Sequence, residues 1–133
     1  MESVVKPRVE RFEDLIAWQK ARLLRSAIRA ATSTNAFRRE VDTRSQVRRA
    51  ALSVMSNIAE GFERGSRADF ARFLVMAKAS CGEVRSILYA ALDDELLDQP
   101  TFRSLLDQTE EVGRIIGGLR TAVAKQRDAQ APR

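Results

Sequence analysis

The chain has 133 residues, of which 44% are hydrophobic and 31% charged, and this composition fits one globular domain rather than a disordered chain. Its formal net charge is +5, with 19 arginines and 4 lysines against 18 acidic residues, so nucleic acid or an acidic protein is a natural partner. Histidine is absent and Cys81 is the single cysteine, which excludes imidazole catalysis, the usual zinc sites and an internal disulfide. We therefore expect no enzymatic activity, no metal and no cofactor.

Two helices are predicted in the first half of the chain. The first has Asp14 as its N-cap and ends near Thr32–Asn35, and the second is capped by Asp42 or Thr43 and stops at Gly61. The predicted core stripe of the first helix consists of Phe12, Ile16, Leu23, Ala27 and Ala30. The predicted core stripe of the second consists of Val47, Ala50, Ala51, Val54 and Ile58.

Two more helices are predicted in the second half. The third opens at Ser66–Asp69, a variant of the capping box, and the fourth begins near Pro100–Thr101. The third stripe consists of Phe70, Phe73, Leu74, Ala77, Cys81, Val84, Leu88 and Ala91. The fourth consists of Phe102, Leu105, Thr109, Val112, Ile116, Leu119 and Val123.

Four amphipathic helices with short links predict an all-α fold, an up-down-up-down antiparallel four-helix bundle. We expect a flexible N-terminal arm over residues 1–11, the bundle over residues 12–124 and a flexible C-terminal tail over residues 125–133. No apolar run approaches the roughly 20 residues of a membrane span, and the N-terminus lacks a signal-peptide core. These features predict a cytoplasmic protein that does not enter the membrane.

The first helix carries an aromatic and basic face beside its apolar residues. At helical spacing Trp18, Arg22, Arg25 and Arg29 share this face, nearly opposite the predicted core stripe. Trp and Arg are typical anchors of subunit interfaces, and they also stack on bases and bind phosphates. A third interpretation is that the tryptophan is partly covered by the N-terminal arm and the arginines are solvated.

A polar row runs along one side of the second helix. Its members are Gln46, Arg49, Ser53, Asn57 and Glu60, and Ser80 and Glu83 of the third helix are placed to face it. Without histidine, Ser53 lacks an ordinary activating base. The row therefore predicts a hydrogen-bonded seam between helices or subunits, a ligand or RNA contact, or, least favoured, a catalytic site using Glu60 or Glu83.

The turn before the third helix forms a second basic feature. Arg64 and Arg67 lie with Glu63 and Asp69 near a helix N-terminus, which suits an anion. Ordinary capping within a charged turn explains the same residues. Cys81 lies on an apolar stripe and is predicted to be a buried, inert thiol.

Three blocks of the chain resemble a known family. The blocks are FEDLIAWQKARLL (12–24), QVRRAALSVMSNIAEGFERGS (46–66) and FARFLVMAKASCGEV (70–84). They look like the four helix bundle proteins encoded in intervening sequences of bacterial 23S rRNA genes. The likeness covers residues 12–95, and NIAEG with the preceding RRAA is its most specific part.

That family is similar to the accessory variability determinant of diversity-generating retroelements. The resemblance implies a homopentameric ring, a basic protein that binds RNA or DNA, and a reverse transcriptase as a further partner. It implies no catalytic residues. The leading hypothesis is therefore a non-enzymatic, oligomeric nucleic-acid-binding protein that uses Trp18, Arg22, Arg25, Arg29, Arg64 and Arg67. The alternative is a scaffold that binds an acidic protein or a reverse transcriptase.

Overall fold

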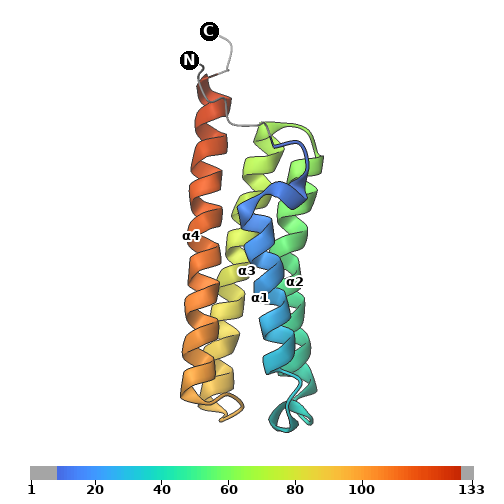
Figure 1. Cartoon of the computed structure of the whole chain (residues 1–133), viewed down its shortest axis with the longest axis vertical. Coiled ribbons are helices and arrows are strands. Elements are labelled where there is room, and N and C mark those ends of the chain that lie inside the picture. Colours follow the sequence, from blue (N-terminus) through green and yellow to red (C-terminus); the bar gives the residue numbers. More distant parts are fainter. Residues whose placement is uncertain (1–8, 130–133) are drawn as a thin grey trace, which may run out of the picture.

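A computed structural model describes residues 9–129, and every long element in that range is helical. Four α-helices pack side by side as a bundle (Figure 1). Their bounds are Ile16–Ala31 for α1, Val41–Glu63 for α2, Arg67–Asp93 for α3 and Gln99–Ala129 for α4. Two short 3-10 helices, Phe12–Asp14 and Asn35–Phe37, precede and follow α1. The predicted all-helical bundle is confirmed.

Each helix packs against its neighbours in the chain, and α4 returns to pack against α1. Consequently α1 and α3 lie diagonally opposite each other, separated by α2 and α4 (Figure 1). The link between α2 and α3 is only three residues long, which forces these two helices to run antiparallel as neighbours.

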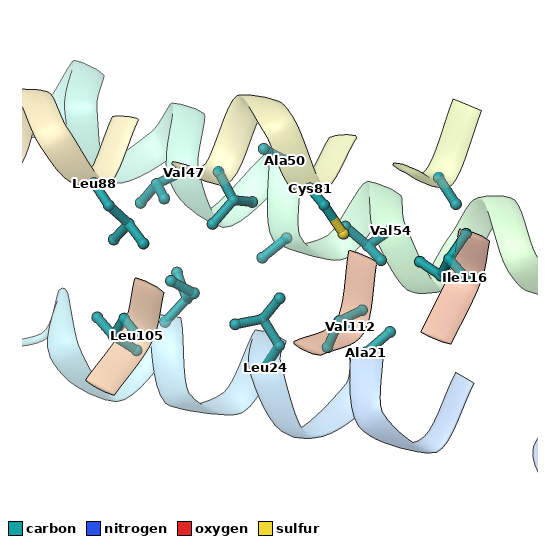
Figure 2. Close-up of a cluster of buried hydrophobic side chains, with 14 of the residues drawn as sticks. Ala21, Leu24, Val47, Ala50, Val54, Cys81, Leu88, Leu105, Val112 and Ile116 are labelled. Carbon is teal, nitrogen blue, oxygen red and sulfur yellow. The ribbon is translucent and has the colours of Figure 1, made fainter. Parts of the chain in front are cut away.

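The core predicted for α2, α3 and α4 is largely confirmed. All five residues of the α2 stripe are buried, as are most of the α3 and α4 stripes, while Phe70 and Leu119 are half-buried. Figure 2 shows side chains from all four helices converging between them, including Ala21, Leu24, Val54, Cys81 and Val112. In α2, α3 and α4 the longest row of apolar residues at helical spacing is the row that turns inward.

The core stripe predicted for α1 is wrong. Ile16 and Leu23 are 57% and 59% exposed. The face that packs inward instead carries Ala17, Ala21, Leu24 and Ile28. Its small alanines let α1 approach its neighbours closely, and its spacing of four, three and four residues is that of an amphipathic helix. The helix is thus rotated by roughly a third of a turn from the predicted orientation.

Gly61 was predicted to end α2, but the helix continues to Glu63. A Cβ atom at Gly61 would lie 2.5 Å from the Cβ of Phe73, so this glycine permits the close packing of α2 on α3. The chain turns instead at Gly65, whose φ of +86° lies in the left-handed region that glycine adopts readily.

The predicted caps are confirmed only in part. At the start of α3, Ser66 Oγ accepts a hydrogen bond from the Asp69 amide at 3.0 Å, as predicted. Asp14 lies in a 3-10 helix and does not cap α1, and α2 begins at Val41 without a side-chain cap from Asp42 or Thr43. Helix α4 begins at Gln99, so Pro100 lies in its first turn as predicted, and Asp98 caps it because its Oδ1 accepts from the Thr101 amide at 2.8 Å.

The ends of the bundle differ from the predicted domain bounds. Helix α4 continues to Ala129, so the first five residues of the predicted C-terminal tail are helical. Residues 1–8 of the predicted arm and residues 130–133 of the predicted tail lie outside the described part of the chain. None of the helices within residues 9–129 is long and apolar enough to cross a membrane.

Candidate nucleic-acid interface

A basic groove lies between α1 and α2, near the end of the bundle where α1 stops and α2 starts. It encloses about 510 Å³. The five arginines that line it come from both helices: Arg25, Arg29, Arg44, Arg48 and Arg49. The remaining lining residues are Val41, Ser45 and Leu52. We call this feature the α1–α2 groove.

Arg48 is fixed in the groove by hydrogen bonds to the end of α1. Its Nε donates to Thr32 Oγ1 at 2.9 Å, and its Nη2 donates to Thr32 O at 3.3 Å and to Ser33 Oγ at 3.1 Å. The Thr32 hydroxyl in turn donates to Ile28 O at 2.8 Å. Arg48 therefore caps the α1 carboxyl end, where a cation is favoured by the helix dipole.

The groove concentrates positive charge, and its arginines form no ion pair with a described carboxylate. Of the ion pairs formed within residues 9–126, none involves any of the five groove arginines. Desolvation lowers the pKa of the Arg48 guanidinium, and the nearby charges of Arg29 and Arg44 lower that pKa further. The arginines therefore repel one another, and a bound anion would relieve this repulsion.

The aromatic and basic face predicted on α1 is divided by the fold. Arg25 and Arg29 line the α1–α2 groove, whereas Trp18 and Arg22 lie on a separate shallow depression with Leu23. Trp18 is half-buried, with its ring 5.2 Å from Phe12 in an edge contact and the Arg22 guanidinium 5.6 Å above it. The inward face of α1 is not the predicted one. Arg25 and Arg29 consequently border α2 rather than point away from the bundle.

One member of the polar row of α2, Ser53, hydrogen-bonds to α3, as the seam interpretation predicted. Ser53 Oγ and Ser80 Oγ are 2.9 Å apart, and Asn57 Nδ2 donates to Ser53 Oγ at 3.0 Å and to Ser53 O at 2.9 Å. Glu83 lines a small cavity of about 260 Å³ together with Gln46, Arg49 and Ser53. The seam lies within one subunit.

The ends of that row make local contacts. Glu60 is paired with Arg64 at 3.2 Å, one turn away at the end of α2, and Arg49 Nη2 donates to Ser45 Oγ at 3.4 Å. Both pairs are solvent-exposed and contribute little to stability. Arg49 is the one member of the row that also lines the α1–α2 groove.

Arg64 and Arg67 lie at the opposite end of the bundle from the groove, at the turn between α2 and α3. The Arg64 guanidinium also stacks 4.9 Å from the Phe73 ring, and Arg67 Nη1 donates to the Gln126 carbonyl at 3.4 Å. Both side chains are thus engaged within the subunit. The fold does not bring them together with Arg25 and Arg29.

A second basic depression, of about 380 Å³, lies between α3 and α4. Its cations are Lys78, Arg85 and Arg114, and Glu110 lies among them, with its carboxylate 3.7 Å from Arg85. Cys81 lines it from below and is 3% exposed, so the predicted burial of this thiol is confirmed. Burial raises the pKa of Cys81 to about 11. We call this feature the α3–α4 depression.

Arg44 and Arg48 were missed as site residues in the sequence. They follow each other by one helical turn beside the α2 core residues Val47 and Ala51, on the side that turns toward α1. Their spacing could have been read as a basic row. What could not be read is that this row faces Arg25 and Arg29, because that depends on the rotation of α1.

Together the fold and the groove define a class: an all-α four-helix bundle with a basic interhelical groove. The profile of the family described as 23S rRNA-intervening sequence protein matches residues 13–118. The chain therefore belongs to the 23S rRNA-intervening sequence protein family, as its sequence resemblance implied.

One solved structure shows the same fold. It is a protein with unknown function from the S23 ribosomal protein family of Bacteroides thetaiotaomicron VPI-5482. The two chains superpose with a TM-score of 0.72 at 19% sequence identity, over 79% of this chain and 98% of that chain. No curated protein matches the sequence significantly.

Proposed function

We propose that this protein is a non-enzymatic nucleic-acid-binding protein that holds RNA or DNA phosphates in the α1–α2 groove. The observation that carries the proposal is the clustering of five arginines from two helices without a carboxylate ion pair among the described residues. Guanidinium groups bind phosphate oxygens through paired hydrogen bonds, and such contacts supply most sequence-independent affinity. The lack of histidine in the whole chain supports the non-enzymatic part.

The preorganisation of Arg48 also supports phosphate binding. Its side chain is already held by Thr32 and Ser33, so less conformational entropy is lost when an anion binds.

The test is an electrophoretic shift assay at low salt with structured RNA, single-stranded RNA and DNA, and duplex DNA. We expect a shift that Arg25→Glu with Arg29→Glu weakens strongly and that added salt weakens steeply. The matched control is Arg85→Glu with Arg114→Glu, which changes the same net charge in the α3–α4 depression and should bind almost normally. No shift with any nucleic acid would refute the proposal.

An acidic protein or a reverse transcriptase is the alternative partner, because carboxylates also pair with arginine. The resemblance to the accessory variability determinant supports this alternative. A pull-down from the source cell, repeated after nuclease treatment, separates the two. Partners that are lost with nuclease favour nucleic acid, and partners that survive favour the scaffold.

We also propose that the protein assembles with itself, as a ring of five subunits by the family resemblance. Two exposed apolar surfaces support self-assembly: Ile16 and Leu23 on α1, and Val75, Met76 and Tyr89 on α3. Because α1 and α3 are diagonal in the bundle, these surfaces lie on different sides of the subunit. A head-to-tail contact of α1 on the next copy's α3 covers both, and such contacts form a ring when the rotation between copies closes.

Multi-angle light scattering tests the assembly. Leu23→Glu and Val75→Glu should each give monomers, and their mixture should give one-to-one dimers, because each variant retains one intact surface. Monomers of the unmodified protein would refute self-assembly. A Trp18→Ala variant that keeps the native mass would show that Trp18 is not an interface anchor.

A further inference from the structure

The α1–α2 groove contains exposed apolar side chains at positions where phosphate binding alone does not need them. Val41 is 55% exposed and Leu52 is 47% exposed, and both line the groove. On α2 they lie on the same side as Arg44 and Arg48, in the order apolar, arginine, arginine, apolar. This row spans three turns of helix, or about 16 Å.

The groove lacks the side chains that usually read adenine and cytosine edges. Among the described residues that line it there is no Asn, Gln, Asp or Glu, and Ser45 is the one uncharged polar side chain. Amide and carboxylate groups are the usual readers of adenine and cytosine edges. The groove therefore offers charge for phosphates and apolar surface for flat groups, and guanine is the base whose edge its arginines can read.

The flat faces of the bases are exposed in a single strand and stacked inside a duplex. In a duplex the base faces are stacked inside and only their edges reach the grooves. In a single strand the unstacked faces are free to lie on apolar side chains and on guanidinium planes. The volume of about 510 Å³ is that of a site for a drug-sized molecule, so it suits a few nucleotides of one strand.

We propose that the α1–α2 groove binds a single strand, with its phosphates on the arginines and its base faces on Val41 and Leu52. This inference rests on the proposed function and deepens it, because it names the form of nucleic acid that the groove selects. It also predicts tolerance of base sequence, since stacking surfaces accept every base.

The experiment is fluorescence anisotropy with a labelled oligouridylate and with a duplex RNA of the same length, at one salt concentration. We expect the single strand to bind at least tenfold more tightly than the duplex. The Val41→Ser and Leu52→Ser double variant should weaken single-strand binding about tenfold, the effect of losing about 50–60 Å² of apolar contact, and should leave the salt dependence unchanged. Val9→Ser, an exposed valine outside the groove and outside the proposed assembly surfaces, is the matched control and should bind normally.

The outcomes separate this inference from the proposed function. Equal or tighter binding of the duplex overturns the single-strand inference and leaves phosphate binding in the groove intact. A double variant that weakens duplex and single strand equally overturns the role of Val41 and Leu52. Failure to bind either RNA overturns the proposed function itself. Both substitutions are at exposed positions, and an unchanged melting temperature verifies that the double variant is folded.

Discussion

The α1–α2 groove and the α3–α4 depression are both basic, but they differ in how their charges are balanced. In the depression Glu110 lies among the cations, 3.7 Å from Arg85. In the groove five arginines face one another without an ion pair to any described carboxylate. Judged only by the residues that line them, both would be anion-binding sites. Local neutralisation distinguishes a surface that is satisfied within the subunit from one that lacks a counter-charge.

The largest expected effect comes from giving the groove the carboxylate that the depression already has. Ser45→Glu places an acidic side chain among the groove arginines at an exposed position. The new carboxylate competes with phosphate for one or two arginines, so single-strand affinity should fall about 50-fold, or ~2.3 kcal/mol. Ser45→Gln is the neutral control and should bind within about twofold of the unmodified protein. Anisotropy titrations measure both, and equal affinities for the two variants would contradict the account.

The next effect concerns the floor of the depression, where Cys81 is buried. Its pKa of about 11 exceeds the value near 8.5 of a free thiol, so the folded state holds the proton more tightly than the unfolded state does. The resulting stability is complete below pH 8.5 and is lost as the pH rises toward 11. Between pH 8 and pH 11 the free energy of unfolding should fall by about 2 kcal/mol more for the unmodified protein than for the Cys81→Ala variant. Urea unfolding at several pH values measures this, and parallel curves would show that the thiol is hydrated.

A smaller effect is expected from changing how one groove cation is held. Arg48→Lys keeps the charge but loses the planar contacts to Thr32 and Ser33. Binding should weaken about tenfold, with little change in the salt dependence, because the number of cations is the same. Isothermal titration with oligouridylate measures the change. Arg49→Lys is the control, since Arg49 contacts only Ser45 at 3.4 Å, and it should change affinity less.

The smallest effect is the reverse conversion, in which the depression loses its carboxylate. Glu110→Gln releases Arg85 from its ion pair and leaves the cations of the depression without a balancing carboxylate. In a background carrying Arg25→Glu and Arg29→Glu, this change should raise the residual RNA affinity about threefold, or ~0.6 kcal/mol. A gain comparable to full wild-type binding would show that the groove has no special geometry.

The sequence predicted three of the four core faces because the longest apolar row at helical spacing is the buried row in α2, α3 and α4. In α1 two rows compete, and each contains one Ile, one Leu and two Ala, so their hydrophobicity does not distinguish the exposed row of Ile16 and Leu23 from the buried row of Leu24 and Ile28. The correct row is built on Ala17 and Ala21, which add little hydrophobicity but allow close packing. Only the packing against the neighbouring helices decides between them. Gly61 shows the same limit. In the sequence, a glycine that permits close helix packing looks the same as a glycine that ends a helix.

The sequence predicted parts of the candidate site, but as separate features. The sequence singled out Arg25 and Arg29 as part of a basic face, and Arg49 as part of a polar row. That these residues line one groove with Arg44 and Arg48 depends on the rotation of α1 and on its pairing with α2. By contrast, the contact of Ser53 with Ser80 followed from helical spacing alone, because the stripes of α2 and α3 were assigned correctly.

The most direct test of phosphate binding in the α1–α2 groove is the salt dependence of single-strand binding. Each arginine that contacts a phosphate contributes about 0.7 to the slope of log K against log salt concentration. Arg25→Ala with Arg29→Ala should therefore make the slope shallower by about 1.4, while Arg85→Ala with Arg114→Ala should leave the slope unchanged. An unchanged slope in the groove variant, or an equal change in both variants, would contradict the account.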